Sequence, residues 1–401
     1  MTAKLYHQNG CTQCDAAVLD CRANADSTFD ILLDRTAIYP EGGGQLSDTG
    51  YIGSARCTHA REDGGEIWHR CDKPIEIGQC VHVAADEAVR LDHTQQHTGE
   101  HMLSGLAHSM FGCTNVGFHM ADDIVTVDFD KPLSAEQIAE LELKVNEAIQ
   151  RDEPTRTVTV TPEEYETIEI RKKAKGLKGE ITVVYAGGVD SCTCCGTHCQ
   201  SAGQVGVLKI LSHMNYKGGV RIGFVCGMRA VLSMQQDGAR MDAIARRFST
   251  SADKAVDAVI KQGDELAAMK REFKQRTDIL LDYRAKELAE KAELCGKTRA
   301  VVTMEEGLEA NELGFLCEKL CAHGNMVAVV LAQKGENLSY RVARSADVAL
   351  SMRELIQAVN ALFGGKGGGR DDSAQGSAKL NGSAKDSVEQ LKAYVYRRIK
   401  G

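Results

Sequence analysis

Two short segments of the sequence, about a hundred residues apart, each carry a pair of side chains that can bind a metal. In QQHTGEHMLSG, His97 and His101 are four residues apart in a stretch with the apolar period of a helix. Residues so spaced share one helix face, with Cβ atoms about 5–6 Å apart, so both imidazoles can reach one ion. In DSCTCCGTHCQ, Cys194 and His198 lie at a predicted turn between two strands. A fold that uses both pairs must bring this helix and this turn together.

The two pairs together predict one Zn²⁺ site per chain. Three imidazoles and one thiolate form a tetrahedral nitrogen and sulfur set that suits Zn²⁺. Either pair alone is a weak signal, because histidine pairs also occur on ordinary packed or solvated helices. His93 precedes His97 by the same spacing, and further thiols flank the turn at Cys192, Cys195 and Cys199. The predicted ligands are His97, His101, Cys194 and His198.

A competing interpretation makes the same helix a peptidase motif. The run from His97 to His101 also matches H-x-x-E-H, the pattern of inverted zinc peptidases, in which Glu100 would act as the general base. That mechanism requires a third ligand, usually a carboxylate, farther along the chain. It leaves Cys194 and His198 without a role, so it ranks second. In the preferred interpretation, Glu100 is expected to face solvent.

The first half of the chain predicts a β-rich domain followed by an α+β domain. At 401 residues, 43% of them hydrophobic and 26% charged, the chain is long enough for several globular domains. Residues 1–90 alternate short apolar stretches with Gly, Asp and Pro, which favours strands. Within them, YPEGGGQLSDTG predicts a tight turn or a backbone that another group approaches closely. Residues 91–230 include a predicted helix over 134–154, capped by Ser134, and a strand–turn–strand over 180–211.

The second half predicts a helical arm and a small α/β domain, so the whole chain has an α+β multidomain fold. Residues 231–292 almost lack glycine and proline, and they carry apolar residues seven apart at Val259, Leu266, Phe273 and Leu280. This spacing indicates a long helix with a helical partner, either in this chain or in a second copy. Residues 293–401 alternate strands and helices, with a glycine-rich loop over 364–372 and a final helix near 384–396.

Charge and hydropathy limit the partners. No apolar run reaches the ~18 residues of a membrane span, and the N-terminus lacks the build of a signal peptide, so we expect a cytoplasmic protein without membrane contact. The net charge of −8 argues against a surface that coats nucleic acid. Two basic segments remain, 171–178 and the residues after Gly365. The candidate phosphate-binding residues are Lys172, Lys173, Lys175, Lys178, Lys366 and Arg370.

Four motifs in order carry a resemblance to a known family. They are YPEGGGQLSDTG, HTGEHMLSG, CCGTH followed by GQVGVLKI, and GGKGGGRDDSAQG. With these motifs the chain resembles the long form of the free-standing alanyl-tRNA editing proteins (AlaX type), and through them the editing and C-terminal domains of alanyl-tRNA synthetase. The resemblance covers nearly the whole chain. Because the aminoacylation core that would precede these motifs is absent, we do not expect the chain to activate alanine.

The resemblance implies a division into four parts. These are a glycine-motif domain like a β-barrel (1–90), a zinc-bearing editing domain (91–230), a helical arm (231–292) and a C-terminal glycine-rich α/β domain (293–401). It implies zinc-ligand roles for His97, His101, Cys194 and His198, leaves His93 outside the set, and places Gln45 at the mouth of the editing pocket. In one departure, Cys195 stands where the family turn Cys-Gly-Gly-Thr-His has its first glycine.

The implied activity is zinc-dependent hydrolysis of the aminoacyl ester on mischarged tRNA(Ala). A pocket that accepts alanine rejects serine by only ~10²-fold and glycine by only ~1–3 kcal/mol, so a second, hydrolytic site must remove both. We expect Ser-tRNA(Ala) as the first substrate and Gly-tRNA(Ala) as the second. Gln45 and Thr114 are the candidate catalytic residues, with Thr114 reading the serine hydroxyl. Asp190 is expected to orient a ligand histidine from outside the coordination sphere.

The partner implied by the resemblance is tRNA(Ala) that carries a wrong amino acid, held by Lys172, Lys173, Lys366 and Arg370. A homodimer through the helical arm and the C-terminal domain is a further expectation. The resemblance to a synthetase also suggests nucleotide (ATP) binding. Because GGKGGGR lacks the P-loop pattern, nucleotide hydrolysis is not predicted. Besides the peptidase, a tRNA-binding module without catalysis remains an alternative.

Overall fold

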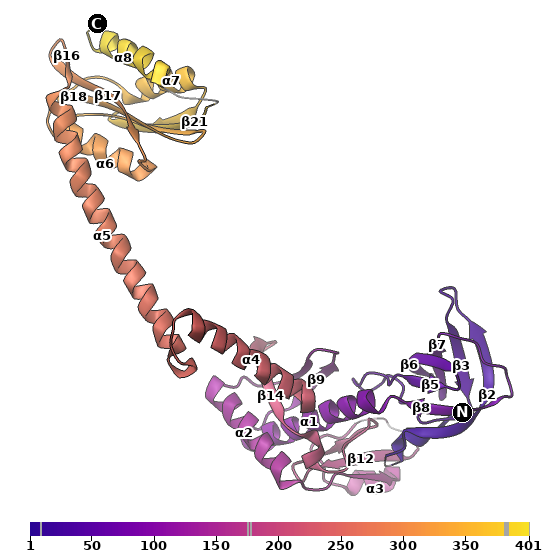
Figure 1. Cartoon of the computed structure of the whole chain (residues 1–401). Coiled ribbons are helices and arrows are strands. Elements are labelled where there is room, and N and C mark those ends of the chain that lie inside the picture. Colours follow the sequence, from indigo (N-terminus) through magenta and orange to yellow (C-terminus); the bar gives the residue numbers. More distant parts are fainter. Residues whose placement is uncertain (9, 175, 177–178, 381–384, 401) are drawn as a thin grey trace. The chain divides into compact units, whose positions relative to one another are not determined.

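The computed structural model describes residues 1–8, 10–174, 176, 179–380 and 385–400 (Figure 1). The chain divides into two compact units, residues 1–244 and residues 245–401, and each is described by itself. None of the helices in these described ranges is long and apolar enough to cross a membrane.

A closed barrel begins the first unit, as the β-rich pattern of residues 1–90 predicts. Alternate residues of its strands point inward, and the interior is filled by apolar side chains such as Ile31, Leu33, Ile52 and Ile67. A short parallel pair, β1 (Ala3–Lys4) with β4 (Arg35–Thr36), lies outside the barrel. In order around the barrel the strands are β2 (Gln13–Ala23), β3 (Phe29–Leu33), β7 (Glu66–Cys71), β6 (Ala55–Asp63), β5 (Gly50–Ile52) and β8 (Cys80–Ala85).

Helix α1 (Glu87–Phe111) follows the barrel directly and forms the centre of the first unit (Figure 1). It begins where the Asp86 carboxylate accepts hydrogen bonds from the N–H groups of Ala88 and Val89. It ends at Gly112, whose φ of 64° is the left-handed conformation that glycine adopts at a helix C-terminus. Most residues between Arg90 and Ala107 are buried, so the polar ones among them need partners inside the protein.

A four-stranded sheet and helix α2 (Ala135–Arg151) pack against α1. The sheet has the order β14 (Leu208–Tyr216), β15 (Gly219–Cys226), β10 (Val125–Phe129) and β9 (Asn115–Met120), all antiparallel. The predicted helix at 134–154 is confirmed with Ser134 as its N-cap; the capping box is completed by Gln137. Met102, Phe129, Leu141 and Phe224 meet in the common core.

A second, three-stranded sheet leads to the cysteine-rich turn. It consists of β11 (Arg156–Val160), β12 (Ile181–Ala186) and β13 (Asp190–Thr193), with the short helix α3 (Pro162–Thr167) after β11. The chain leaves β13 at Thr193, passes through the turn and a 3₁₀ helix (Ala202–Val205), and enters β14. The predicted strand–turn–strand therefore joins two different sheets.

The single helix predicted over 231–292 is wrong. The structure has α4 (Gly227–Arg247) and α5 (Ala255–Glu290), separated by a turn and a 3₁₀ helix (Ala252–Lys254). In the intervening FSTSAD, Ser249 has a φ of 50° and Ser251 is extended, because serine and aspartate side chains favour turns and caps over helix interiors. The four heptad residues of α5 are exposed, Phe273 at 72%, so the described residues of the second unit do not cover them.

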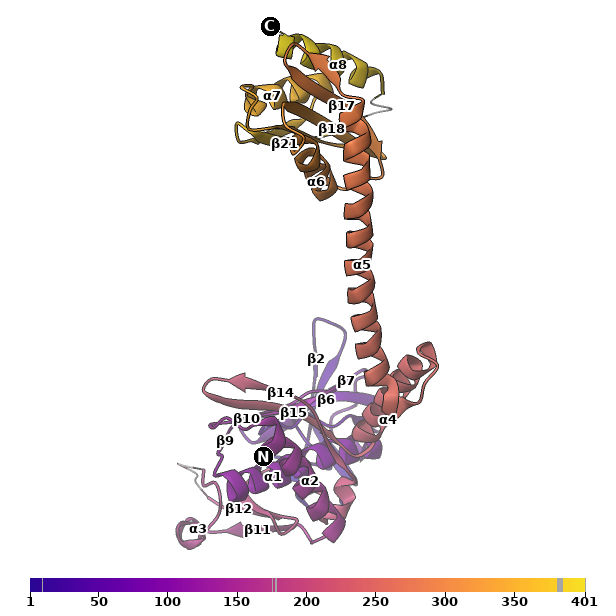
Figure 2. The ribbon, with the colours of Figure 1, turned by 90° about the vertical axis from the view of Figure 1, so that its left-hand side faces the viewer.

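The second unit ends in a six-stranded sheet with helices on both faces (Figure 2). Helix α6 (Ala310–Cys321) shares one core with the end of α5, while α7 (Met352–Phe363) and α8 (Lys385–Lys400) share the core on the other face. The final helix predicted near 384–396 is therefore confirmed within the described residues. The strand order is β16 (Glu293–Cys295), β17 (Thr298–Glu306), β18 (Met326–Lys334), β19 (Asn337–Arg344), β21 (Ser373–Lys379) and β20 (Lys366–Gly369).

The glycine-rich loop predicted at 364–372 is partly wrong, because its middle is the edge strand β20. Gly367 pairs with Gly376 and Gly369 with Ala374 of β21. A Cβ on Gly367 would overlap the carbonyl of Gln375, so the absence of side chains is what allows this close pairing.

Candidate metal centre

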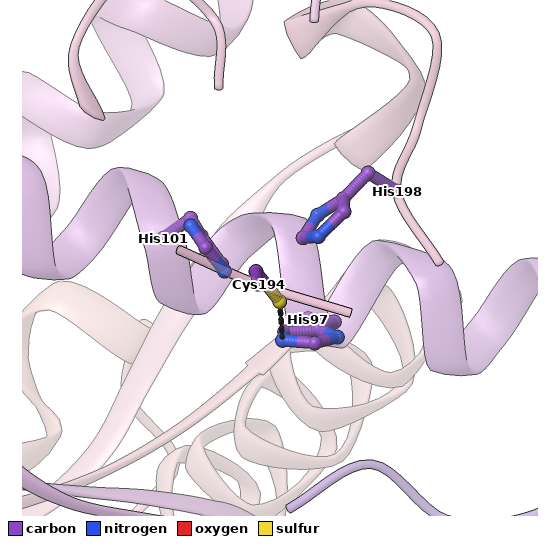
Figure 3. A group of neighbouring side chains, drawn as sticks. All are labelled: His97, His101, Cys194 and His198. Carbon is purple, nitrogen blue, oxygen red and sulfur yellow. Dashed lines mark hydrogen bonds between the residues drawn. The ribbon is translucent and has the colours of Figure 1, made fainter. Parts of the chain in front are cut away.

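The two predicted ligand pairs meet in the first unit. The ligand atoms of His97, His101, Cys194 and His198 all lie within 4.8 Å of one another, and Figure 3 shows the four side chains converging from α1 and the turn after β13. Nε2 of His97 is 3.4 Å from the Cys194 sulfur. The ring centroid of His198 is 4.7 Å from that of His97 and 4.7 Å from that of His101. One turn of helix thus supplies two donors and the cysteine-rich turn supplies two.

His198 shows that this group fits a metal. Both of its ring nitrogens are buried, and neither has a hydrogen-bond partner among the described residues. An unpaired buried nitrogen costs about 1–3 kcal/mol in desolvation, and coordination of an ion would satisfy it. Three imidazoles and a thiolate are also the donor set that suits Zn²⁺.

The electrostatics of Cys194 point the same way. Burial by itself raises the pKa of this thiol, but the nearby imidazoles of His97 and His198 bring the pKa well below its ordinary value. The N–H of Gly196 donates to the sulfur at 3.3 Å. The thiolate is the form of cysteine that binds metal, so the turn presents the residue in its coordinating state.

Asp190 holds His101 from behind. Its Oδ2 is 2.9 Å from Nδ1 of His101, which leaves Nε2 directed at the other ligands. Arg171 donates to the same carboxylate from Nε (2.5 Å) and from its terminal nitrogen (3.0 Å). Although burial favours the protonated acid, His101 and Arg171 lower the pKa of Asp190 to about 2. The Cys192 sulfur also lies 3.4 Å from Nδ1 of His101.

Gln45 lies elsewhere than at the expected pocket mouth. Its side chain is fully buried, with Oε1 2.8 Å from Nδ1 of His97 and 3.0 Å from the N–H of Thr197. Its Nε2 donates to the Thr197 hydroxyl at 2.8 Å. Every polar atom of the amide is therefore engaged with the metal cluster and its turn. Gln45, expected at the mouth of the pocket, instead lies inward behind His97.

The expectation that Glu100 faces solvent is wrong. Its side chain is 4% exposed and accepts hydrogen bonds from Ser104 and, at 2.6 Å, from Nδ2 of Asn115. Asn115 begins β9, so the carboxylate ties α1 to the sheet. Glu100 can be buried next to a ligand because its carboxylate has hydrogen-bond partners inside the core. The spacing of apolar residues along a helix does not show such partners.

Thr114 lies apart from the cluster. It is exposed at the end of the α1–β9 connection, and its N–H donates to the Asp130 carboxylate at 2.7 Å while its carbonyl accepts from the Asp130 N–H at 3.1 Å. Within the described part of the chain, Thr114 is not among the residues that contact His97 or line the cavity next to His198.

Four of the candidate phosphate-binding residues are described. Nζ of Lys172 donates to the carbonyl of Asn115 at 3.0 Å, and Nζ of Lys173 donates to that of Glu166 at 2.8 Å. In the second unit, Lys366 is exposed on β20, and the exposed Arg370 forms an ion pair with Asp372. Lys175 and Lys178 lie outside the described residues.

The sequence interpretation missed several residues that shape the centre. The ring of Phe118 on β9 stacks on His97 at 5.4 Å with an interplanar angle of 16°. Thr197 bonds Gln45 and also lies 2.9 Å from the hydroxyl of Thr94 on α1. Arg171 was counted in a basic segment, and no local pattern distinguishes it from its exposed neighbours. Cys192 was named among the thiols that flank the turn, but its contact with His101 was not predicted.

A cavity of about 380 Å³ opens beside His198. The turn forms one wall, α1 forms another with Arg90 and Thr94, and the N-terminal segment forms a third with Tyr6 and His7. The buried hydroxyl of Thr155 also borders it and has no hydrogen-bond partner in the described ranges. Cavities of this size and mixed polarity accept small ligands or the end of a larger one.

Two family models match parts of the chain. The model described as "Threonyl and Alanyl tRNA synthetase second additional domain" matches residues 181–222, which run from β12 through the cysteine-rich turn into β15. The DHHA1 domain model matches residues 296–400, which contain most of the six-stranded sheet.

Curated relatives extend the likeness over almost the whole sequence. The alanyl-tRNA editing protein AlaX-L of Pyrococcus horikoshii is 28% identical, over 98% of this chain and 100% of that protein. The alanyl-tRNA editing protein Aarsd1 of Rattus norvegicus is 31% identical, over 59% of this chain and 58% of its own length. Among solved structures, the C-Ala domain of Aquifex aeolicus alanyl-tRNA synthetase matches 27% of this chain and 98% of its own, with 24% identity and a TM-score of 0.26.

Proposed function

Since this chain is related along nearly its whole length to the alanyl-tRNA editing proteins, we propose that it hydrolyses the aminoacyl ester of mischarged tRNA(Ala) in trans. The observation that carries the proposal is the His₃Cys cluster, one member of which, His198, lines a cavity of about 380 Å³. His198 thus places the candidate metal centre next to a cavity that we propose receives the aminoacylated end of the tRNA. The resemblance stated from the four sequence motifs is thus confirmed by the comparisons, and the activity is what we infer from it.

The substrate we propose first is Ser-tRNA(Ala), with Gly-tRNA(Ala) second. Serine differs from alanine by one hydroxyl, which a pocket for alanine rejects by only ~10²-fold. A hydrolytic site that hydrogen-bonds this hydroxyl refuses alanine by ~10⁴–10⁵, because alanine would leave its polar groups unpaired. The unpaired Thr155 hydroxyl at the cavity wall supports such a preference.

His97, His101, Cys194 and His198 would hold the zinc ion. Bound there, zinc would supply either a Lewis acid for the ester and its attacking water or an anchor for the substrate's amino group. The chain's own residues orient the ligands: Asp190 fixes His101, and the N–H of Gly196 stabilises the Cys194 thiolate.

The peptidase interpretation has less support. A general base must reach the attacking water, but Glu100 is buried and bonded to Ser104 and Asn115. It would have to leave two hydrogen bonds to act. This observation favours ester hydrolysis by a centre that includes Cys194 and His198 over the H-x-x-E-H mechanism.

We also propose that tRNA phosphates contact Lys172 and Lys173 in the first unit and Lys366 and Arg370 in the second. Lys172 pairs with Cys192 of β13, the strand that leads to the metal centre, and Lys173 follows it in the chain. Lys366 and Arg370 are exposed. The exposed apolar face of α5 supports a homodimer, because the described residues of the second unit leave Leu266, Phe273 and Leu280 exposed.

The test is a deacylation time course on Ser-tRNA(Ala), Gly-tRNA(Ala) and Ala-tRNA(Ala). It uses zinc-loaded wild type beside His97→Ala, with circular dichroism and zinc content measured on both. We expect rapid loss of serine, slower loss of glycine and no loss of alanine, and we expect His97→Ala to lose at least a hundredfold of the serine rate. Folded, zinc-bound wild type that spares all three esters would reject the proposal and favour a tRNA-binding module without catalysis.

A further inference from the structure

The triple glycine of the barrel forms a turn that directs Gln45 into the protein. Gly42 and Gln45 exchange two backbone hydrogen bonds, of 3.1 and 3.0 Å, which close the turn. Gly43 and Gly44 have φ values of 61° and 86°, which residues with a Cβ rarely adopt. At Gly44 a Cβ would also lie 2.5 Å from Cδ1 of Phe118. The turn therefore needs glycine for its conformation and for its contact with β9.

The hydrogen bonds of Gln45 fix which way its amide points. The N–H of Thr197 can only donate, so the atom that it meets at 3.0 Å must be the carbonyl oxygen, Oε1. The amide nitrogen then donates to the Thr197 hydroxyl at 2.8 Å. The orientation thus follows from the backbone of the turn rather than from a choice between two similar atoms.

This orientation sets the state of His97. Because Oε1 can only accept, the ring nitrogen 2.8 Å away, Nδ1, must carry a proton. Nε2 of His97 is then the ring nitrogen left to face the cluster, and it lies 3.4 Å from the Cys194 sulfur. The amide of Gln45 therefore fixes the proton on Nδ1 and directs Nε2, the nitrogen that would bind an ion, at the cluster.

Packing holds the ring as firmly as the hydrogen bond does. Phe118 stacks on one face of the His97 imidazole. A Cβ on Gly196 would overlap the imidazole and lie 2.8 Å from Oε1 of Gln45, so the turn touches the ring edge directly. The three histidines accordingly differ: His97 has an amide behind it, His101 has a carboxylate, and His198 has no partner in the described residues.

We infer that Gln45 is a positioning residue of the metal centre, by which the barrel sets the tautomer and the orientation of His97 and joins both ligand pairs through Thr197. The inference rests on the proposed metal site, and it goes beyond it by making the barrel part of the site. In this account the glycine turn serves to direct Gln45 toward His97. Residues that orient metal-bound histidines from behind typically contribute 10–100-fold to metal affinity.

The experiment measures the Zn²⁺ dissociation constant of the full chain at one pH by competition with a chromophoric chelator. Gln45→Leu keeps the side-chain volume and removes the acceptor, and we expect it to bind Zn²⁺ about 10–100-fold more weakly. Gln45→Glu keeps an acceptor for Nδ1–H, and the Thr197 hydroxyl can donate to it, so we expect affinity at or above that of wild type. Co²⁺ spectra of the same variants report whether the coordination geometry changes.

The matched control is Gln96→Leu. Gln96 is equally buried on α1, but its amide bonds the backbone N–H and carbonyl of Cys226 and no ligand side chain. We expect its affinity within about threefold of wild type, with a loss of stability similar to that of Gln45→Leu. If Gln45→Leu does not fold, the test rests on Gln45→Glu. Zn²⁺ affinity of Gln45→Glu tenfold weaker than that of wild type would overturn the inference.

The outcomes separate this inference from the proposed function. Wild type that binds no Zn²⁺ would reject the metal centre itself. Wild type and Gln45→Leu that bind Zn²⁺ equally would overturn the role of Gln45 and leave the centre intact. Equal losses in Gln45→Leu and Gln96→Leu would also overturn it, since they would show a general effect of packing.

Discussion

Arg171 donates two hydrogen bonds to Asp190, and both side chains are almost wholly buried, at 8% and 0% exposure. Asp190 in turn bonds His101, so a guanidinium, a carboxylate and an imidazole form a chain that ends at the candidate metal centre. Buried charges are tolerated only as a set, because removing one leaves the other unpaired in a medium of low polarity. We therefore expect the same contact to affect both stability and metal binding.

Asp190→Asn is expected to lower the free energy of unfolding by about 3–5 kcal/mol, because the buried Arg171 loses its counter-charge. It is also expected to weaken Zn²⁺ binding about 10–100-fold, because His101 loses a charged acceptor. Thermal unfolding and chelator competition measure the two effects. The control is Asp128→Asn, which breaks the more exposed pair with Arg221 and should cost about 1 kcal/mol or less. Equal effects of the two substitutions would contradict this account.

Gly196→Ala is expected to reduce Zn²⁺ affinity and the deacylation rate at least tenfold, with the fold retained. The added methyl would overlap the His97 imidazole, which is held by Gln45 and Phe118 and cannot move away freely. Gly368→Ala is the matched control, because a Cβ there meets nothing within 4 Å. Zinc content and serine release are measured on both proteins. Unchanged zinc affinity in Gly196→Ala would show that the ring has room to shift.

The barrel is expected to lose stability on mild acidification because of His69. Burial lowers the pKa of this histidine from 6.5 to about 4, while its hydrogen bonds to Ile31 and Thr36 use the neutral ring. The unfolded chain binds a proton that the folded barrel refuses, so this stability is present above pH 6.5 and is lost as the pH falls toward 4. Between pH 7 and pH 5 the expected loss is about 2 kcal/mol.

Urea unfolding followed by tryptophan fluorescence measures this loss, because the single tryptophan, Trp68, precedes His69 on β7 and is buried. His69→Gln cannot titrate and should show a flatter dependence of stability on pH. His82→Gln, at an exposed position of β8, should keep the wild-type dependence. A wild-type barrel equally stable at both pH values would refute the assignment.

Phe273→Glu is expected to convert a dimer into a monomer. Phe273 is the most exposed of the four heptad residues of α5, and a charge at the centre of a helical interface is destabilising. Sedimentation equilibrium should give twice the chain mass of 43.5 kDa for wild type and the single mass for the variant. Leu143→Glu, at an isolated exposed position of α2, should leave the mass unchanged. A monomeric wild type would end the dimer proposal.

The double substitution Lys366→Ala and Arg370→Ala is expected to weaken tRNA binding and to reduce the slope of affinity against salt by about 1–2. The two side chains are exposed on and beside β20, where phosphate can reach them. Lys334→Ala is the control, since this exposed lysine of β18 is not among the candidate phosphate contacts. Filter binding at several salt concentrations gives both quantities, and an unchanged slope would remove these residues from the interface.

The local features of the fold followed from the sequence because they depend on neighbours a few residues apart. The spacing of His97 and His101 is a property of any helix, and Ser134 caps its helix through a residue three positions away. The alternation of residues 1–90 predicted strands, and their closure into a barrel fits that pattern. These signals are short in range, and packing elsewhere does not reverse them.

What the sequence could not decide is which distant groups meet. Gln45 and His97 are 52 residues apart, and the Thr197 that locks their contact is 152 residues from Gln45. The sequence predicts Glu100 at the surface, but Asn115 and Ser104 bond it in the core. The glycines after Lys366 read as a loop in the sequence, but they pair with β21.

The sequence by itself thus determined the donor atoms of the candidate centre and the elements that carry them. Only the tertiary structure decided which donors have a partner behind them, because the free energy of a buried polar group depends on the groups packed around it.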